Sequence, residues 1–161
     1  EQSTLVSLDW LHGRRSPHSD PTKKGIISGI TLATSAGDIF KSLVEATAFG
    51  SKAILDHYRS EGIEINDIIC VGGIPQKSPY VMQTLCNILG VPIKVAQTEQ
   101  AGALGAAMSA ATAANVFSRI EEAQEKMGSQ IIKTFYPDIE IHRKYMIIYE
   151  KYNQLGTLSN I

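Results

Sequence analysis

The feature that most constrains the fold of this chain is a repeated order of apolar run, short turn and amphipathic stretch. The runs DIICV at 67–71 and IKV at 93–95 are each followed by a helical pattern. Strands that alternate with helices in this way are joined by crossover connections and lie parallel in one sheet. DIICV has no polar residue after its aspartate, which is typical of a strand with both faces covered. The sequence therefore predicts an α/β layer fold with parallel strands and crossover helices.

Two shorter strand candidates and a long helix precede these runs. TLVSL at 4–8 and GIISGI at 25–30 are apolar enough for strands, and the segment between them is rich in Gly, Pro, Ser and Asp, which favours a loop. Ser35 followed by Asp38 is the pattern of a capping box. Apolar residues then recur at helical spacing until about Gly62. We therefore expect a long helix after Ser35.

Two further helices are expected in the middle of the chain. One runs from Ser78 to about Leu89, because Ser78 is a good cap, Pro79 suits the first helical position and Gly90 ends the pattern. Thr98 is the expected cap of the next helix. Its first turn then carries Glu99, where a carboxylate is favoured by the helix dipole.

Residues 115–161 form a separate, more polar section. Ser118 with Glu121 has the pattern of a capping box, and DIEIHRKYMIIYEKYNQLG at 138–156 has helical spacing after the interruption at Pro137. We expect this section to be a helical extension, a pair of helices packed on the surface of the α/β domain.

The glycine pair in CVGGIPQKSPY, at 70–80, is the strongest candidate for a ligand site. Ligands bind at the carboxyl ends of parallel strands, and Gly72 and Gly73 follow the strand DIICV at that point. Glycines permit a tight turn and let a flat or charged ligand approach the backbone. Ser78 would direct the amide donors of its helix at the same crevice, and Lys77 lies on the approach. The alternative is that the glycines only shape the turn and that the lysine is solvated.

Two other segments have competing interpretations. AGALGAAMSAATAA at 101–114 has the small residues that let a helix lie very close to a sheet or another helix, and packing is the favoured explanation over ligand contact. GRRSPHSDP at 13–21 has two arginines that suit a phosphate, but an irregular loop held by Arg–Asp and turn contacts is the preferred interpretation.

No catalytic or metal-binding set can be assembled from the sequence. The four histidines lack metal-ligand spacing, and no Ser/His/Asp or Cys/His arrangement is recognisable. Cys70 and Cys86 are interpreted as small buried hydrophobes in a reducing compartment.

Charge and hydropathy exclude some function classes. The net charge of −1 over 161 residues offers no basic excess for nucleic acid or an anionic membrane. No signal peptide opens the chain, and its longest low-polarity stretch is too short to span a bilayer. A cytoplasmic protein is expected. The first residue is a glutamate, which indicates a fragment or a processed chain.

Five segments in a fixed order resemble a known family. LDWLHGRRSPHSDP, GIISGITLAT, LVEATAFG, VGGIPQKSP and ALGAAMSA are similar to the C-terminal domain of the FGGY carbohydrate kinases, most closely its ribulokinase branch. From Gly25 to Glu45 the chain follows the second signature of the family, with Leu43 as the visible departure. The resemblance covers nearly the whole chain, residues 1–161.

The resemblance implies part of an actin-like, ribonuclease-H-like ATPase domain that binds ATP and Mg²⁺. In such kinases the Gly-Gly turn lies against the adenosine end of ATP, which implies ATP-binding roles for Gly72 and Gly73. Lys77 stands where glycerol kinases have an asparagine, so an adenine contact there would differ. The catalytic aspartate, the sugar site and the phosphate-binding hairpins belong to the N-terminal part of the family.

The resemblance therefore implies an ATP-dependent kinase of a ketopentose that needs an N-terminal domain as partner. We expect the isolated chain to be inactive, and the missing strands to leave a sheet edge that favours self-association. Alternatives are a xylulokinase-like member of the family and a non-catalytic interaction module.

Overall fold

Helix α1 (Ala36–Ser60) is the longest element of the computed structural model, which describes residues 5–158. It begins with the predicted capping box. The backbone N–H of Asp38 donates to Ser35 Oγ at 3.2 Å, and the backbone N–H of Ser35 donates to Asp38 Oδ2 at 2.9 Å. The expected helix is therefore confirmed, and its last residue lies two positions before Gly62.

The two N-terminal strands form a small sheet of their own. β1 (Val6–Leu8) pairs antiparallel with β2 (Ile26–Ser28), with Ser7 opposite Ile27. Both strands lie within the predicted segments, but neither joins a parallel sheet. All three residues of β1 are buried, because α1 and helix α6 (Ile139–Leu158) pack on this strand.

The second sheet has the order β3–β4–β5. β3 (Ile68–Cys70) and β4 (Ile93–Ala96) are parallel, with Cys70 opposite Val95, and helix α3 (Pro79–Leu89) lies in the crossover between them. This part of the predicted topology is confirmed. β5 (Ile131–Phe135) was not predicted, and it pairs antiparallel with β4.

The prediction of a purely helical section after residue 115 is therefore wrong. Its described part holds helix α5 (Ile120–Met127), strand β5 and helix α6. The predicted pairing of Ser118 with Glu121 is also wrong. Both the hydroxyl and the backbone N–H of Ser118 donate to Glu122 Oε2, at 2.9 and 3.0 Å. The helix starts only at Ile120, so the carboxylate one residue further along reaches Ser118.

The start of helix α4 (Ala101–Ala113) also differs from the prediction. Its N-cap is Gln100, without a side-chain cap, and Thr98 Oγ1 instead accepts from the backbone N–H of Gln100 at 3.2 Å. Thr98 thus stabilises the turn before the helix, and Glu99 precedes the helix. In the part of the chain that the structure describes, no helix is long and apolar enough to cross a membrane.

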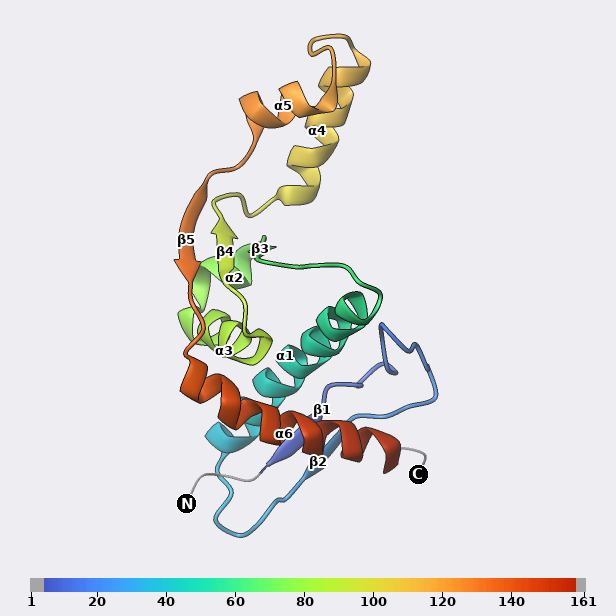
Figure 1. Cartoon of the computed structure of the whole chain (residues 1–161), viewed down its shortest axis with the longest axis vertical. Coiled ribbons are helices and arrows are strands. Elements are labelled where there is room, and N and C mark those ends of the chain that lie inside the picture. The colour runs from blue at the N-terminus through green and yellow to red at the C-terminus, as the bar shows by residue number, and fades with distance from the viewer. Residues whose placement is uncertain (1–4, 159–161) are drawn as a thin grey trace.

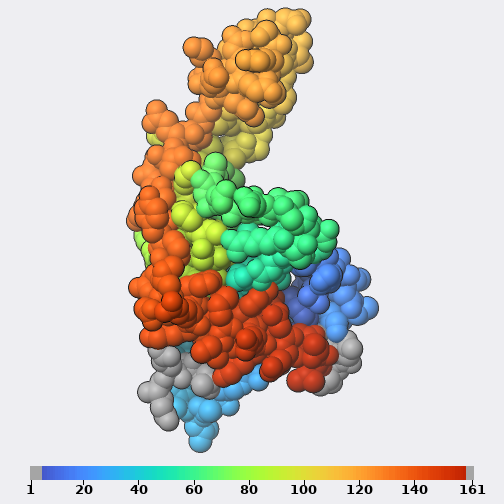
Figure 2. All heavy atoms as spheres, viewed as in Figure 1, coloured from blue at the N-terminus to red at the C-terminus, as the bar shows by residue number. Residues whose placement is uncertain are grey.

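Two predictions of close packing fail among the described residues. Ile69 of β3 and Val71, directly after it, are 58% and 50% exposed, so the predicted run is not covered on both faces. A Cβ built on Gly102 or Gly105 would meet no atom within 4 Å, although these glycines were expected to allow close helix packing. Figures 1 and 2 show the reason: α4 and α5 stand clear of the body of the molecule as a projecting pair.

The hydrophobic core has two clusters, one on each side of α3. One joins β1, α1 and α6 and is dominated by aromatic rings: Trp10, Phe49, Tyr145, Tyr149, Tyr152. The other lies between α3 and the β3–β4–β5 sheet and contains Met82, Cys86, Leu89, Ile93, Val95, Phe135. α6 runs across the first cluster and so ties the C-terminal section to the N-terminal strands (Figure 1).

The cysteines are free thiols. Cys86 is fully buried and packs as the small hydrophobe that was predicted, and burial raises the pKa of its thiol to about 11. Cys70 is only half-buried, and burial raises the pKa of its thiol as well.

We predict that Gly50→Ala stabilises the fold. Gly50 lies inside α1, and a Cβ there would have ordinary contacts, the nearest being Asp9 Oδ2 at 3.4 Å. Replacing a glycine in a helix interior by alanine contributes about 0.5–1 kcal/mol. Urea denaturation should therefore show a higher midpoint at an unchanged slope. A lower midpoint would mean that Asp9 does not tolerate the methyl group.

Candidate functional site

The glycine turn after β3 has the backbone geometry that only glycine adopts readily. Gly72 has φ of 100° and ψ of −175° and precedes helix α2 (Gly73–Lys77). No atom lies within 4 Å of a Cβ built on Gly72. The glycine is therefore needed for the turn itself, and the space beside its backbone is open to a ligand.

Helix α2 was not predicted, and it changes the relation between the glycines and α3. The expected start of α3 is confirmed: Ser78 Oγ accepts from the backbone N–H of Val81 at 3.4 Å, and Pro79 is the first helical residue. However, the five residues of α2 lie between the glycine pair and this cap. The sequence had indicated that the backbone amides next to the glycines belong to α3. They belong to α2 instead.

Gln76 joins the two turns at the carboxyl ends of β3 and β4. Its Nε2 group donates to the carbonyls of Ala96 and Gln97, at 3.2 and 2.6 Å. These two carbonyls lie where β4 ends and the loop to α4 begins. Gln76 thus holds α2 against this loop, and the two βα turns form one edge, as the general rule for parallel sheets requires. Sequence reasoning missed this residue because a glutamine in a turn carries no distinctive signal.

Lys77 lies beside the glycine pair and faces an acidic neighbour. Its Nζ atom is 3.7 Å from a Cβ built on Gly73 and 3.9 Å from Glu99 Oε1. The two charged side chains are 75% and 49% exposed, so this ion pair contributes little to stability. The structure therefore brings Gly72, Gly73 and Lys77 together, and it adds Glu99, which the sequence had assigned to a helix start.

The groups at this edge are an open backbone and an exposed cation, which are suited to contact with a ligand. An open glycine backbone suits a flat group, and Lys77 supplies a cation that can leave its exposed partner. Among residues 5–158, no group of three or more His, Cys, Asp or Glu side chains could hold a metal ion. The described residues therefore supply no metal centre of their own at this turn, and the backbone beside Gly72 is open.

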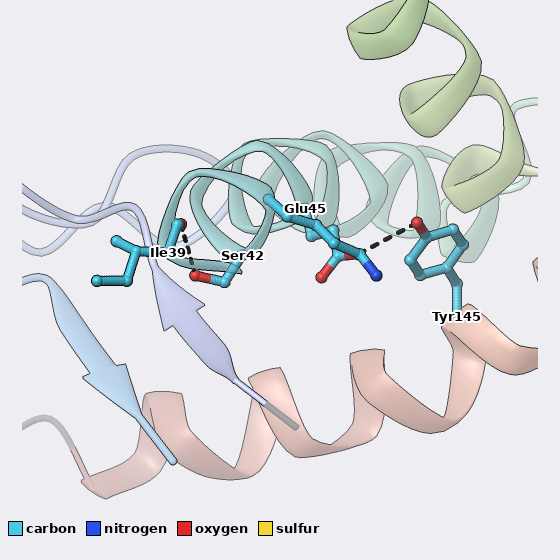
Figure 3. Close-up of polar contacts among 5 residues, drawn as sticks. Ile39, Ser42, Glu45 and Tyr145 are labelled. Carbon is cyan, nitrogen blue, oxygen red and sulfur yellow. Dashed lines mark hydrogen bonds and ion pairs between the residues drawn. The ribbon is translucent and has the colours of Figure 1, made fainter. Parts of the chain in front are cut away.

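A second polar cluster, between α1 and α6, is structural (Figure 3). Tyr145 O–H donates to Glu45 Oε1 at 3.1 Å, and Ser42 O–H donates to the carbonyl of Ile39 at 2.8 Å. Ser42 Oγ also lies 2.7 Å from Ser7 Oγ on β1. Burial raises the pKa of the Glu45 carboxyl, with Lys41 and Tyr145 opposing the shift. Burial and the neighbouring Glu45 raise the pKa of Tyr145. The cluster fixes α6 on α1.

Comparison with curated proteins finds ribulokinases. The chain is 40% identical over 156 residues to the ribulokinase of Vibrio parahaemolyticus and 40% identical over 158 residues to that of Shouchella clausii. These matches cover 97% and 96% of this chain but only 28% of each relative. The chain thus spans a little over a quarter of the length of these curated relatives.

Solved structures with the same fold include sugar and polyol kinases of which this chain covers about a third. A gluconate kinase from Lactobacillus acidophilus superposes with a TM-score of 0.82 at 23% identity, over 98% of this chain and 32% of that chain. A Plasmodium falciparum glycerol kinase solved with ADP gives 0.77 at 21% identity, over 99% and 31%. These likenesses confirm the predicted fold class, the mixed α/β fold of kinase C-terminal, actin-like ATPase domains, here with a long final helix.

The family itself is identified by a direct match. The profile for the FGGY family of carbohydrate kinases, C-terminal domain, matches residues 1–114, which include the glycine turn and helix α4. This chain therefore belongs to the FGGY family of carbohydrate kinases and represents the C-terminal portion of a ribulokinase-like member.

Proposed function

We propose that this chain is the ATP-binding portion of a ribulokinase, an enzyme that transfers the γ-phosphate of ATP to the 5-hydroxyl of a ketopentose. Curated relatives at 40% identity are ribulokinases, whereas four xylulose kinases of known structure share 20–24% identity. Likeness at that lower level supports the fold alone. The relatives thus favour ribulose over xylulose as the substrate.

The observation that carries the nucleotide role is the open turn at Gly72 and Gly73. A bare backbone at the carboxyl ends of parallel strands allows the adenosine end of ATP to lie flat against the chain. Lys77 would contact the nucleotide from the side of α2, in competition with Glu99. One of the solved relatives, a glycerol kinase, was obtained with ADP.

Phosphoryl transfer itself requires groups beyond those described. It depends on a γ-phosphate held with Mg²⁺ and on a base that accepts the hydroxyl proton. Mg²⁺ is usually held by a few carboxylates together with the phosphates of the nucleotide, and residues 5–158 contain no cluster of three acidic or histidine ligands. We propose that Mg²⁺ enters with ATP and that its protein ligands, the base and the sugar site lie in the remainder of the kinase.

The test of the nucleotide role is Gly73→Val. A Cβ on Gly73 would meet only Lys77 Nζ, at 3.7 Å, so there is room for the first atom of a side chain there. The valine would cover the backbone against which adenosine is proposed to lie. We expect binding of ADP, measured by calorimetric titration, to weaken by about tenfold or more, which corresponds to at least about 1.4 kcal/mol.

Gly37→Val is the matched control. Gly37 lies in the first turn of α1, and a Cβ there would meet only Ser35 Oγ, at 3.6 Å. This variant should bind ADP like the parent chain. If Gly73→Val folds and binds ADP unchanged, the glycine pair only shapes the turn and the proposed site is wrong.

A further inference from the structure

A second pocket shares no residue with the glycine turn and is not used by the proposed function. It lies between the loop after β1, the middle of α1 and the end of α6. Its walls carry charged and hydroxyl groups from all three elements: Asp9, Arg14, Arg15, Thr47, Ser51, Tyr152. We propose that this pocket binds the phosphate monoester of a polyhydroxy compound, such as a pentose phosphate. In this proposal, Arg14 and Arg15 bind the phosphate, and the Asp9 carboxylate accepts hydrogen bonds from the hydroxyl groups of the ligand.

Arg14 is held in position without an ion pair among the described residues. Its guanidinium carbon lies 5.0 Å from the centre of the Trp10 ring, which is a cation–π contact. Its backbone N–H donates to Asp20 O at 2.9 Å, and the N–H of Asp20 donates back to Arg14 O at 3.0 Å. The loop was expected to be held by Arg–Asp contacts, and these contacts are made by the backbone.

Neither arginine of the pocket forms an ion pair with a carboxylate within residues 5–158, although the charge of Arg14, after the hydrogen bonds from Thr22, helps to lower the pKa of the Asp20 carboxyl. None of the ion pairs among these described residues includes Arg14 or Arg15. Arg15 is exposed and makes no hydrogen bond through its side chain within the described part of the chain. Two guanidinium groups with free donors at one pocket are suited to a phosphate, which they can bind through paired N–H···O contacts. Among the described residues, no ion pair or side-chain hydrogen bond of Arg15 stabilises the fold.

The wall beneath the arginines is rigid. The Trp10 indole N–H donates to the hydroxyl oxygen of Tyr152 at 3.2 Å, and the two rings meet edge to face. A Cβ built on Gly156 would lie 2.9 Å from Trp10 Cη2, so the indole is packed closely against α6. Trp10 thus presents a fixed platform for Arg14, and little ordering is needed when a ligand binds.

The other wall offers acceptors for hydroxyl groups. Asp9 Oδ1 accepts from Tyr152 O–H at a long 3.4 Å, and burial raises the pKa of the Asp9 carboxyl. The backbone N–H of Asp9 also hydrogen-bonds this carboxyl, and the two contacts together do not use all of its acceptor sites. Gly50 keeps the carboxylate accessible, because a Cβ there would sit 3.4 and 3.7 Å from its two oxygens.

The hydroxyls of α1 also retain acceptor capacity. Thr47 O–H and Ser51 O–H both donate to backbone carbonyls one turn earlier, each at 3.1 Å. Their oxygen lone pairs remain available to hydroxyl groups of a ligand. The carboxylate of Asp9 repels a second anionic group, so the pocket favours a ligand with one phosphate and several hydroxyls.

The test is calorimetric titration of this chain with ribose 5-phosphate, ribose and inorganic phosphate. We expect ribose 5-phosphate to bind about tenfold or more tightly than either of the other two probes. Arg15→Ala should weaken this binding by about tenfold or more, the usual effect of losing a hydrogen bond to a charged group. Because Arg15 is exposed, the variant should fold like the parent chain, which circular dichroism checks.

Two control variants separate this site from nonspecific charge attraction and from the nucleotide site. Arg119→Ala removes the same charge from an exposed position in the α4–α5 projection and should leave binding of ribose 5-phosphate unchanged. Gly73→Val should also leave it unchanged, so failure here and failure at the nucleotide site are distinguishable. The proposal is overturned if ribose 5-phosphate does not bind, if inorganic phosphate binds as tightly, or if Arg15→Ala binds like the parent.

Discussion

Gly90→Ala is expected to lower the free energy of unfolding by about 2–4 kcal/mol. Gly90 ends α3 in the left-handed region, with φ of 68°, where a side chain is strained. A Cβ there would lie 2.7 Å from Cε1 of His142, so the imidazole must move. That ring lies with Nδ1 2.8 Å from the carbonyl of Asn87, a contact that fastens α6 to α3. The variant therefore adds strain and removes this link.

Gly62→Ala separates the two contributions. Gly62 also has a positive φ, of 80°, but no atom lies within 4 Å of a Cβ built there. Only strain of about 1–2 kcal/mol is expected for this variant. Urea denaturation of both variants measures the difference. Equal losses of stability would show that the contact of His142 with Asn87 does not contribute.

The isolated chain is expected to show no phosphorylation of ribulose. Glu99, an acidic side chain beside the candidate nucleotide turn, forms an ion pair with Lys77 and precedes α4. The chain also spans only 28% of the ribulokinase of Vibrio parahaemolyticus, so most of such an enzyme lies outside it. A coupled assay that detects ADP formation should give the same rate with this chain as without protein.

The full-length Vibrio parahaemolyticus enzyme is the positive control for this assay. Ribulose-dependent ADP formation that rises in proportion to the concentration of the isolated chain would contradict the expectation. It would mean that a base and a sugar site lie within these 161 residues.

Local signals in the sequence were sufficient for several elements. Ser35 with Asp38, and Ser78 with Pro79, predicted the starts of two helices, because a cap acts through the backbone groups of its own turn. The glycine pair likewise predicted a turn at the end of β3, and Gly72 has the positive φ that such a turn requires. These features depend on residues close together in the chain.

Elements that depend on distant partners were missed. β5 begins with Ile131 and Ile132, both exposed, and it lacks the alternation of a half-buried strand. It is a strand because β4 offers an edge for antiparallel pairing, which no local pattern reveals. Helix α2 contains Pro75 and is held by the bonds of Gln76 to the loop after β4. Its existence also depends on tertiary contacts.

The expected covering of β3 and α4 failed for a different reason. Apolar side chains such as Ile69 and Val71 have the pattern of a strand covered on both faces, yet they are half exposed here. An apolar sequence pattern indicates that the residues are suited to burial, but it does not indicate which segment buries them. This chain spans only 28% of the length of a curated relative. The pattern therefore does not tell whether the segment that would cover β3 lies inside or outside these residues.

Nucleotide binding at the glycine turn is tested most directly by calorimetric titration of this chain with Mg·ATP, ADP and tripolyphosphate. We predict that ATP and ADP bind and that tripolyphosphate does not, because the open backbone at Gly72 and Gly73 is proposed to receive the adenosine end. Binding of tripolyphosphate as tight as that of ATP, or no binding of either nucleotide, would contradict the proposed site.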